Sequence, residues 1–313
     1  MPVSPEAKEL EALLSDLGSK FPGDGNPFLQ RCIYDQVHRA GAECPNVTLR
    51  DARIRSDRAS GGFIGGIGFQ PVGANAESGR AILFMHGGGY TFGSPNGHRK
   101  LTAHLAFACN CTALSVDYRM SPEHKFPAAL DDCVAGYKHL LELGFNKIVV
   151  AGDSCGGGLS TAVPLALARQ GLPMPVASVS LSPWYDKTTV EGGTMDSNEE
   201  VDVLNAKPFI TMLAERYVDD SGSNRDYPLI SPLHASDEEL AKMPPHWISC
   251  AGCDMLCDHG TRMGERLKKV GVEAAVEVHE GLQHVFEFGV GKVPEADKSI
   301  KDIGVWVKQK FGS

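Results

Sequence analysis

The sequence lacks the features that mark membrane, nucleic-acid-binding and disulfide-stapled proteins. No stretch of the 313 residues reaches the roughly 18 consecutive apolar residues of a membrane span. The net charge is −9, and Lys and Arg form no basic stripe, so we expect no nucleic-acid partner. The first 18 residues carry acidic side chains among their leucines and no basic region before an apolar run. They do not resemble a secretory signal, and we expect a cytoplasmic protein.

The cysteines do not indicate a disulfide framework or a metal site. There are nine of them, an odd number at scattered positions, which favours reduced thiols. Cys250, Cys253 and Cys257 have a metal-like spacing, but no second Cys or His pair follows at zinc-finger distance. We therefore expect no metal and no other cofactor.

The chain shows no internal repeat, but from residue 80 apolar strands alternate with helical stretches. Near-continuous apolar runs are typical of strands that are buried on both faces. Strands are expected at 81–86, 112–118, 147–152, 177–182, 246–252 and 275–280. Helices are expected at 97–109, 127–143, 155–169, 258–270 and 295–311, and Pro164 should kink or shorten the third of them. This order predicts an α/β fold with a mostly parallel sheet covered by helices.

Two other regions differ from this pattern. Before residue 80 we expect helices at 4–17 and 28–40, then strands at 47–55 and 63–69. Residues 184–244 contain no clear strand but do contain a helix near 206–218, which suggests an inserted lid or cap. The predicted organisation is N-terminal cap helices at 1–45, a core at 46–183 and 245–313, and a cap insertion at 184–244.

The motif GDSCG at 152–156 fits the pattern G-x-S-x-G. It follows a predicted strand and opens a helix rich in small residues, which is the context that this motif requires. A serine on such a strained turn is held above the sheet edge, and flanking glycines remove side chains that would clash. Ser154 is therefore the candidate nucleophile. The alternative is a glycine-rich turn with an incidental serine.

The motif HGGGY at 86–90 ends another predicted strand. Its glycines free backbone amides to stabilise the oxyanion of an acyl-transfer intermediate. The expected donors are the amides of Gly88, Gly89 and Cys155, the residue after the nucleophile. A phosphate-binding loop is the weaker interpretation, because neither G-K-S/T nor G-x-G-x-x-G is present there. We expect a structural role for His86.

A nucleophilic serine needs a base, and the base needs an orienting carboxylate. With this serine motif, an Asp or Glu and then a His follow along the chain. His284 stands in a loop after the last predicted strand and is the histidine whose position suits a base. Asp254 follows the preceding strand and is the preferred acid, while Asp258 more plausibly caps or packs beside the next helix.

Taken in order, HGGG, G-D-S-x-G-G, D-x-L-x-D and H-x-F closely resemble the hormone-sensitive-lipase family of α/β-hydrolase carboxylesterases. The segment DYRMSPEHKFPAALDD at 117–132 strengthens the resemblance, which runs from about residue 80 to the end. It implies eight strands, a helical cap, hydrolysis of short- to medium-chain acyl esters by a serine esterase, and a homodimer as an allowed arrangement. The family usually has alanine where this chain has Cys155.

The substrate itself stays open. Tyr90, Trp184, Tyr185, Phe209 and Val285 are candidate walls of a substrate pocket, although the last four fit an ordinary core equally well. A small-molecule ester is the expected substrate. The alternatives are an amide or lactone hydrolase of the same fold and a non-catalytic ligand-binding homologue.

Overall fold

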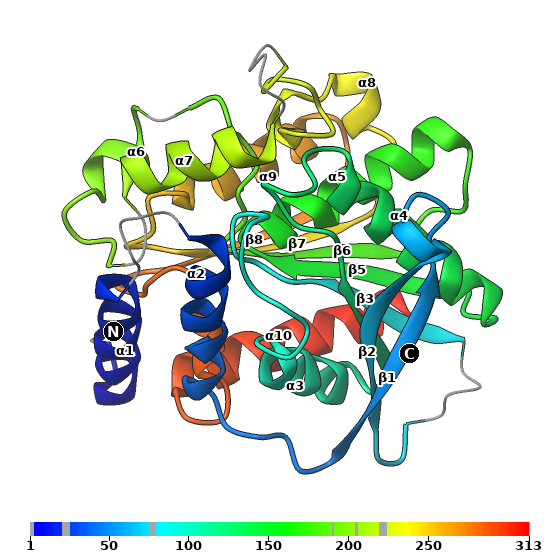
Figure 1. Cartoon of the computed structure of the whole chain (residues 1–313), viewed down its shortest axis with the longest axis horizontal. Helices are drawn as coiled ribbons and strands as arrows, with labels where there is room; N and C mark the ends of the chain where they lie inside the picture. Colours follow the sequence, from blue (N-terminus) through cyan, green and yellow to red (C-terminus); the bar gives the residue numbers. More distant parts are fainter. Residues whose placement is uncertain are drawn as a thin grey trace.

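An eight-stranded sheet organises the chain, as the computed structural model shows for residues 3–20, 26–74, 79–189, 191–203, 206–218 and 224–312. The strand order is β1-β2-β4-β3-β5-β6-β7-β8 (Figure 1). Strand β2 pairs antiparallel with β1 and β4, and every other pairing is parallel. The mostly parallel sheet of eight strands is therefore confirmed.

Each strand expected from the sequence is present, with its ends shifted by no more than two residues. The strands are β1 (Val47–Arg55), β2 (Phe63–Pro71), β3 (Arg80–Met85), β4 (Thr112–Asp117), β5 (Lys147–Asp153), β6 (Ala177–Leu181), β7 (His246–Ala251) and β8 (Ala274–His279). Successive side chains of a strand point to opposite faces. In β3, Ile82 and Phe84 pack into one core cluster and Leu83 and Met85 into another. A strand that is buried on both faces thus explains its unbroken apolar sequence.

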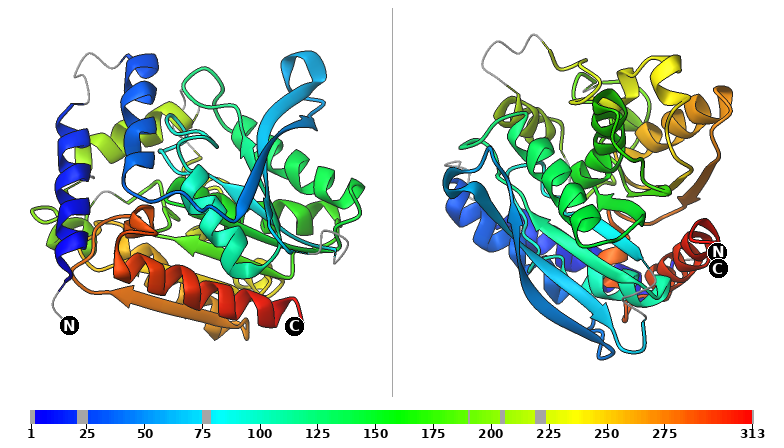
Figure 2. Two further views of the ribbon diagram at one scale, coloured as in Figure 1. Left: turned by 90° about the horizontal axis from the view of Figure 1, so that it is seen from below. Right: turned by 90° about the vertical axis from the view of Figure 1, so that its right-hand side faces the viewer.

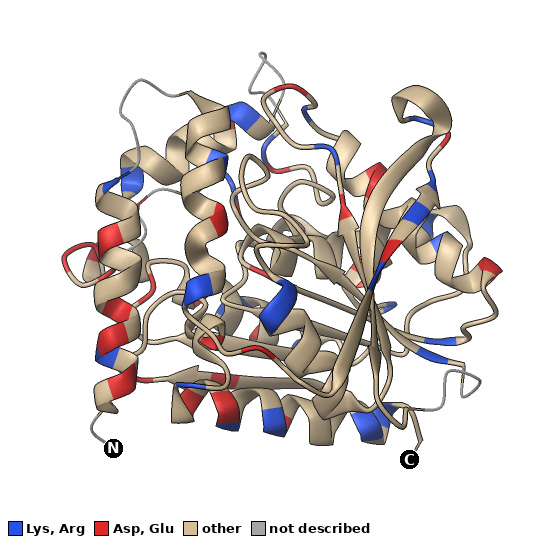
Figure 3. Ribbon diagram, turned by 60° about the horizontal axis from the view of Figure 1, so that its bottom comes forward, with Lys and Arg blue, Asp and Glu red and all other residues tan. Residues whose placement is uncertain are grey.

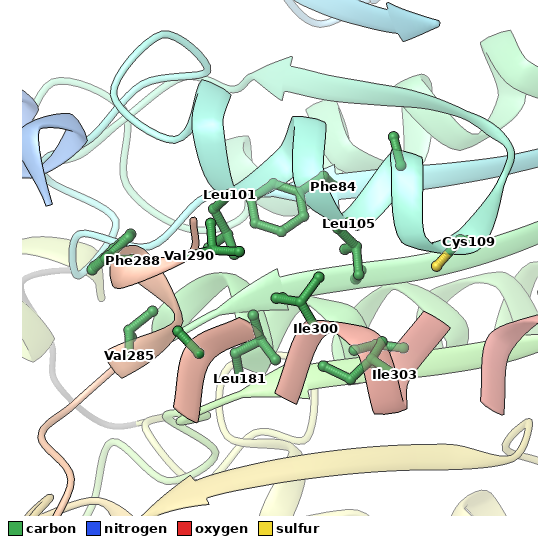
Figure 4. Close-up of a cluster of buried hydrophobic side chains, with 14 of the residues drawn as sticks. Phe84, Leu101, Leu105, Cys109, Leu181, Val285, Phe288, Val290, Ile300 and Ile303 are labelled. Carbon is green, nitrogen blue, oxygen red and sulfur yellow. The ribbon is translucent and has the colours of Figure 1, made fainter. Parts of the chain in front are cut away.

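Helices cover both faces of the sheet. The longer helices are α1 (Pro5–Ser19), α2 (Pro27–Tyr34), α3 (Arg99–Cys109), α4 (Ala128–Glu142), α5 (Cys155–Gln170), α7 (Lys207–Tyr217), α9 (Cys257–Lys269) and α10 (Pro294–Lys310). Helices α3 and α10 lie on one face, and α4, α5 and α9 lie on the other (Figure 2). Figure 4 shows the first of these interfaces, where Leu101 and Leu105 of α3 meet Ile300 and Ile303 of α10.

Two predicted helices differ in detail from the structure. The helix expected at 28–40 is α-helical only to Tyr34 and continues as the 3₁₀ helix η1 (Asp35–Arg39). At this change Ser94 Oγ donates to Asp35 Oδ2 at 2.9 Å, a tertiary contact that helical periodicity does not encode. Helix α5 is not shortened at Pro164 and runs on to Gln170. Pro164 has no N–H to donate to the carbonyl of Ser160. That carbonyl instead accepts the Ser178 hydroxyl at 2.9 Å.

Residues 184–244 contain helices and no strand within their described part. These are α6 (Thr194–Ser197), α7, the 3₁₀ helix η4 (Pro232–His234) and α8 (Asp237–Leu240). Helix α7 corresponds to the helix expected near 206–218. At the start of the chain, Ser4 caps α1 by accepting the Ala7 amide, and its hydroxyl donates to Glu295 of α10 at 2.6 Å.

The surface carries charges of both signs. In Figure 3 acidic and basic residues are interspersed along α10, while acidic residues predominate on α1. Among the described residues, no helix is long and apolar enough to cross a bilayer.

A buried ion pair holds the connection between β4 and α4. The guanidinium of Arg119 donates to both carboxylate oxygens of Asp132, from Nε at 2.8 Å and from Nη2 at 2.9 Å. The Asp132 side chain is fully buried and also accepts the Ser56 hydroxyl at 2.9 Å. Removal of the guanidinium would leave this carboxylate buried without its main counter-charge.

We therefore expect Arg119→Met to lower the free energy of unfolding by about 3 kcal/mol, because an uncompensated buried charge is strongly destabilising. Chemical denaturation with urea at neutral pH measures the loss. Arg55→Met is the matched control, because Arg55 pairs with Asp57 in solvent and should lose less than about 1 kcal/mol. Equal losses of unfolding free energy in the two variants would contradict a stabilising role for the Arg119–Asp132 ion pair.

Candidate active site

The candidate catalytic residues stand on four loops that leave one edge of the sheet. Ser154 follows β5, His284 follows β8, and Asp254 follows β7. The glycine loop at 86–90 follows β3. Parallel strands end at a common edge, and open α/β sheets bind their ligands in the crevice outside those ends. Fold topology thus gathers segments that lie nearly 200 residues apart in the sequence, between positions 86 and 284.

Ser154 occupies a strained turn between β5 and α5. Its backbone angles are φ 55° and ψ −119°, a region that costs a non-glycine residue about 1–3 kcal/mol. Three hydrogen bonds hold its backbone there. The Ser154 amide donates to Leu181 O at 2.8 Å, and its carbonyl accepts the amides of Trp184 at 2.9 Å and Gly158 at 3.1 Å. The turn directs the side chain toward the pocket, which Ser154 lines.

Glycines let this turn approach the neighbouring loop. A Cβ at Gly156 would collide with the carbonyls of Met85 and His86, and a Cβ at Gly152 would collide with Met85 O. The small residues of the motif are therefore required by backbone-to-backbone contact between the β3 and β5 loops.

Asp254 and His284 form a buried hydrogen-bonded pair. Asp254 Oδ2 lies 2.6 Å from His284 Nδ1, and Asp254 Oδ1 accepts the Leu256 amide at 2.8 Å. Since a carboxylate only accepts hydrogen bonds, Nδ1 carries the hydrogen and Nε2 is left as the basic nitrogen. Burial lowers the pKa of His284, but the carboxylate of Asp254 outweighs it, so the pKa lies above its usual value of 6.5.

The loop that carries Asp254 is held by the inserted segment. Asn198 Nδ2 donates to Gly252 O at 2.8 Å and to Asp254 O at 2.9 Å. Asp202 Oδ2 accepts the Met255 amide at 2.9 Å. Nothing in the sequence pointed to Asn198, because its role depends on two segments that meet only in the folded chain.

The glycine loop presents the amides expected of an oxyanion hole. Gly88 has φ 108° and Gly89 has φ 59°, conformations that glycine adopts without strain. Within the described part of the chain, neither amide donates a hydrogen bond to another protein group. Cys155 is the first residue of α5, so its amide has no acceptor inside the helix. Gly88 and Gly89 line the same pocket as Ser154 and His284.

A buried Asp153–His98 pair that the sequence analysis missed contacts this loop. Asp153 Oδ1 accepts the Gly87 amide at 3.0 Å, and Oδ2 lies 3.3 Å from His98 Nε2. Burial opposes the charged imidazole, but Asp153 outweighs it and raises the pKa of His98. His86, by contrast, is buried beside His98, which lowers its pKa to about 3, and its ring stacks on Tyr118 at 4.2 Å. A neutral, stacked His86 fits the structural role expected for it.

The pocket above Ser154 is apolar and has a volume of about 280 Å³. Its walls come from the N-terminal helices, the glycine loop, the inserted segment and the loops after β7 and β8. The lining residues are Gly18, Tyr34, Gly88, Gly89, Phe92, Ser154, Trp184, Val203, Ala206, Phe209, Ile210, Leu213, Leu256 and His284. Phe92 stacks between Tyr34, at 5.9 Å, and Phe209, at 6.1 Å, which gives one wall an aromatic face.

The five wall residues suggested by the sequence separate into two groups. Trp184 and Phe209 line the pocket, whereas Tyr90, Tyr185 and Val285 do not. Tyr90 is buried against Tyr217 with ring centroids 3.5 Å apart, and Tyr185 donates to Ser180 Oγ at 2.6 Å inside a separate core cluster. Val285 packs into the core beside α10. Of the lining residues that were missed, Phe92 follows the HGGGY motif closely, but Tyr34 had no local signal.

Among the described residues, no group of three or more His, Cys, Asp or Glu side chains is arranged to hold a metal ion. Asp258 lies in the first turn of α9 without capping it.

Comparison with known proteins agrees with this geometry. The sequence model of a protein family described as an alpha/beta hydrolase fold matches residues 82–288. Over 282 residues the chain is 32% identical to an acetyl-hydrolase from Streptomyces hygroscopicus, which covers 85% of this chain and 92% of the relative.

Two solved structures are similar over nearly the full length. One is an esterase from the bacterial hormone-sensitive lipase family, with 31% identity, a TM-score of 0.88 and complete coverage (100%) of both chains. The other is a hormone-sensitive lipase from a metagenome library, with 33% identity, a TM-score of 0.87 and coverage of 99% of this chain and 100% of the other. The chain therefore belongs to the α/β-hydrolase family, within its hormone-sensitive-lipase branch.

Proposed function

We propose that this protein is a serine carboxylesterase that hydrolyses short- to medium-chain acyl esters through an acyl-enzyme intermediate. The observation that carries the proposal is the 2.6 Å Asp254–His284 pair in a pocket that Ser154 and the Gly88–Gly89 amides also line. These are the parts that acyl transfer needs: a nucleophile, an oriented base and an oxyanion site. The esterase names of the relatives support the same reaction class.

The mechanism follows from the roles of these groups. His284 Nε2 takes the proton of Ser154 as its oxygen bonds to the ester carbonyl carbon, and the carbonyl oxygen becomes the oxyanion. The amides of Gly88, Gly89 and Cys155 stabilise that charge. The carbon–oxygen bond to the alcohol then breaks, and His284 returns its proton to the leaving alcohol. Water, deprotonated by His284, attacks the acyl-enzyme in the same way and releases the acid and free Ser154.

The pocket favours a small substrate. Its volume of about 280 Å³ lies near the low end of the roughly 300–1,000 Å³ of ligand pockets. The lining is mostly aliphatic and aromatic, which suits an uncharged acyl or alkyl group. Amide and lactone hydrolysis use the same groups, and no contact in the pocket favours them over ester hydrolysis.

The pocket also supports a division of the chain into core and cap. Gly18 and Tyr34 come from the N-terminal helices, and Val203, Phe209 and Leu213 come from the insertion. We assign residues 1–45 and 184–244 to a cap and residues 46–183 and 245–313 to the hydrolase core. Residues 1–2, 21–25, 190, 204–205 and 219–223 of this cap lie outside the described residues.

The first prediction concerns the nucleophile and the pocket size. Purified protein should hydrolyse p-nitrophenyl acetate and butyrate, lose rate as the chain lengthens toward palmitate, and lose about 10⁴-fold or more of kcat in Ser154→Ala. Initial rates over the ester series measure both effects. A folded protein that is inactive on every ester but active on a matched amide or lactone would contradict the ester assignment. Inactivity on all three, with a ligand bound in the pocket, would indicate a binding protein.

The second prediction concerns the pKa of His284. NMR titration of labelled histidines should give a pKa above 6.5 for His284 in the wild type and a lower pKa in Asp254→Asn, because the carboxylate that raises it most is then lost while the lowering effect of burial stays. The acid limb of kcat/KM, which needs neutral His284, should move to lower pH while its plateau falls. The pair should stabilise the fold fully below pH ~6.5, with the contribution lost as pH rises through the folded pKa.

His246 is the control for this titration. Burial lowers its pKa to about 4, and its ring contacts Pro244 O and Thr161 rather than the candidate site. Its titration should be the same in both proteins. If His284 titrates identically in wild type and Asp254→Asn, the two side chains are not coupled in solution.

A further inference from the structure

The thiol of Cys155 lies between the two ends of the glycine loop. Its Sγ accepts the Tyr90 amide at 3.2 Å and lies 3.9 Å from His86 O, to which it can donate. A further contact joins it to Tyr118 Oη at 3.8 Å. Cys155 is fully buried and is not among the residues that line the pocket. Its side chain therefore touches the loop but does not reach a substrate.

A thiol is suited to this place because it donates and accepts weakly at one atom. The Tyr90 amide is buried, and a buried backbone N–H without a partner is costly. Tyr90 also has φ 61°, an uncommon conformation for a residue with a side chain, so its amide depends on a fixed acceptor. An alanine side chain at this position would supply neither a donor nor an acceptor.

The protonation state agrees with donation to His86 O. Burial raises the pKa of the Cys155 thiol to about 11, so the S–H is retained at neutral pH. The two anchored residues, His86 and Tyr90, bracket Gly87, Gly88 and Gly89 in the sequence. Contacts that hold both ends of this short loop restrict the directions that the amides between them can take.

We propose that the Cys155 side chain is a positioning residue that holds the Gly88 and Gly89 amides in place for the oxyanion. The inference rests on the proposed esterase function and deepens it. Cys155 then has two roles. Its amide donates to the oxyanion, and its thiol connects the glycine loop to the nucleophile turn through hydrogen bonds.

The test compares Cys155→Ala and Cys155→Ser with Cys133→Ala as the matched control. Cys133 is a fully buried thiol of α4 in the same core cluster, and in the described part of the chain no hydrogen bond joins it to the glycine loop. We expect kcat on p-nitrophenyl butyrate to fall about tenfold in Cys155→Ala, while KM stays within about twofold of the wild type. Loss of one oxyanion donor lowers kcat by about 10²–10³-fold, and displacement of a donor should lower kcat less. Serine, which donates and accepts, should keep kcat within about threefold of wild type.

A second readout separates positioning from general loss of stability. A trifluoromethyl ketone forms a tetrahedral adduct with a serine hydroxyl and carries an oxyanion, so its affinity should fall in parallel with kcat in Cys155→Ala. In Cys133→Ala the melting temperature should fall, but kcat and inhibitor affinity should match the wild type.

The outcomes distinguish the two proposals. A wild type without activity would overturn the esterase function itself. An active wild type whose Cys155→Ala variant keeps kcat within about twofold, or whose serine variant is as slow as alanine, would overturn only the positioning role. If the alanine variant does not fold, the test instead compares Cys155→Thr with Cys155→Val, whose side chains are similar in shape. The threonine variant should then be about tenfold faster than valine, and equal rates would overturn the inference.

Discussion

The parallel pairing of β3 with β5 sets the distance between the two loops on which the candidate site depends. Met85 pairs with Gly152 in this register, so the glycine loop and the nucleophile turn leave the sheet side by side. Their backbones are close enough that a Cβ at Gly156 would strike Met85 O and His86 O. A shift of either strand would therefore separate Ser154 from the Gly88 and Gly89 amides, which explains why both motifs need glycine where they touch.

Polar groups beneath this contact do several tasks at once. Asp153 accepts a hydrogen bond from the Gly87 amide and lies 3.3 Å from His98 Nε2, so one carboxylate contacts both the glycine loop and a buried histidine. On the other side of the turn, the fully buried Lys187 donates to Trp184 O at 2.6 Å, and the Trp184 amide donates to Ser154 O. Burial lowers the pKa of Lys187 to about 7. The strained serine is thus supported through main-chain carbonyls, and the groups that support it need not contact a substrate.

Much of this architecture could be predicted from the sequence because it depends on local patterns. Unbroken apolar runs marked the strands, and the order of strands and helices indicated a parallel sheet whose loops meet at one edge. That reasoning brought Ser154, Asp254 and His284 to the same edge, where the structure has the Asp254–His284 hydrogen bond. Their catalytic roles stay predictions until activity is measured.

What the sequence could not predict depends on contacts between distant segments. Tyr34 reaches the pocket from the second helix, and Asn198 holds the Asp254 loop from the insertion, without any local motif to mark either. Tyr185 fitted a pocket wall and an ordinary core equally well by its sequence, and in the structure it packs into a core cluster. The Ser160 carbonyl, which has no N–H partner at Pro164, accepts the Ser178 hydroxyl from β6, a contact between segments that the helix sequence does not encode.

The most direct test of the central claim is to identify the residue that a fluorophosphonate probe modifies. The probe phosphonylates an activated serine with loss of fluoride, and mass spectrometry of the digested protein locates the added mass. We expect one adduct, on the peptide that contains Ser154, formed rapidly in the wild type and far more slowly in a protein with His284→Ala. An adduct on another residue, or labelling of Ser154 at the same rate without His284, would contradict a nucleophile activated by the Asp254–His284 pair.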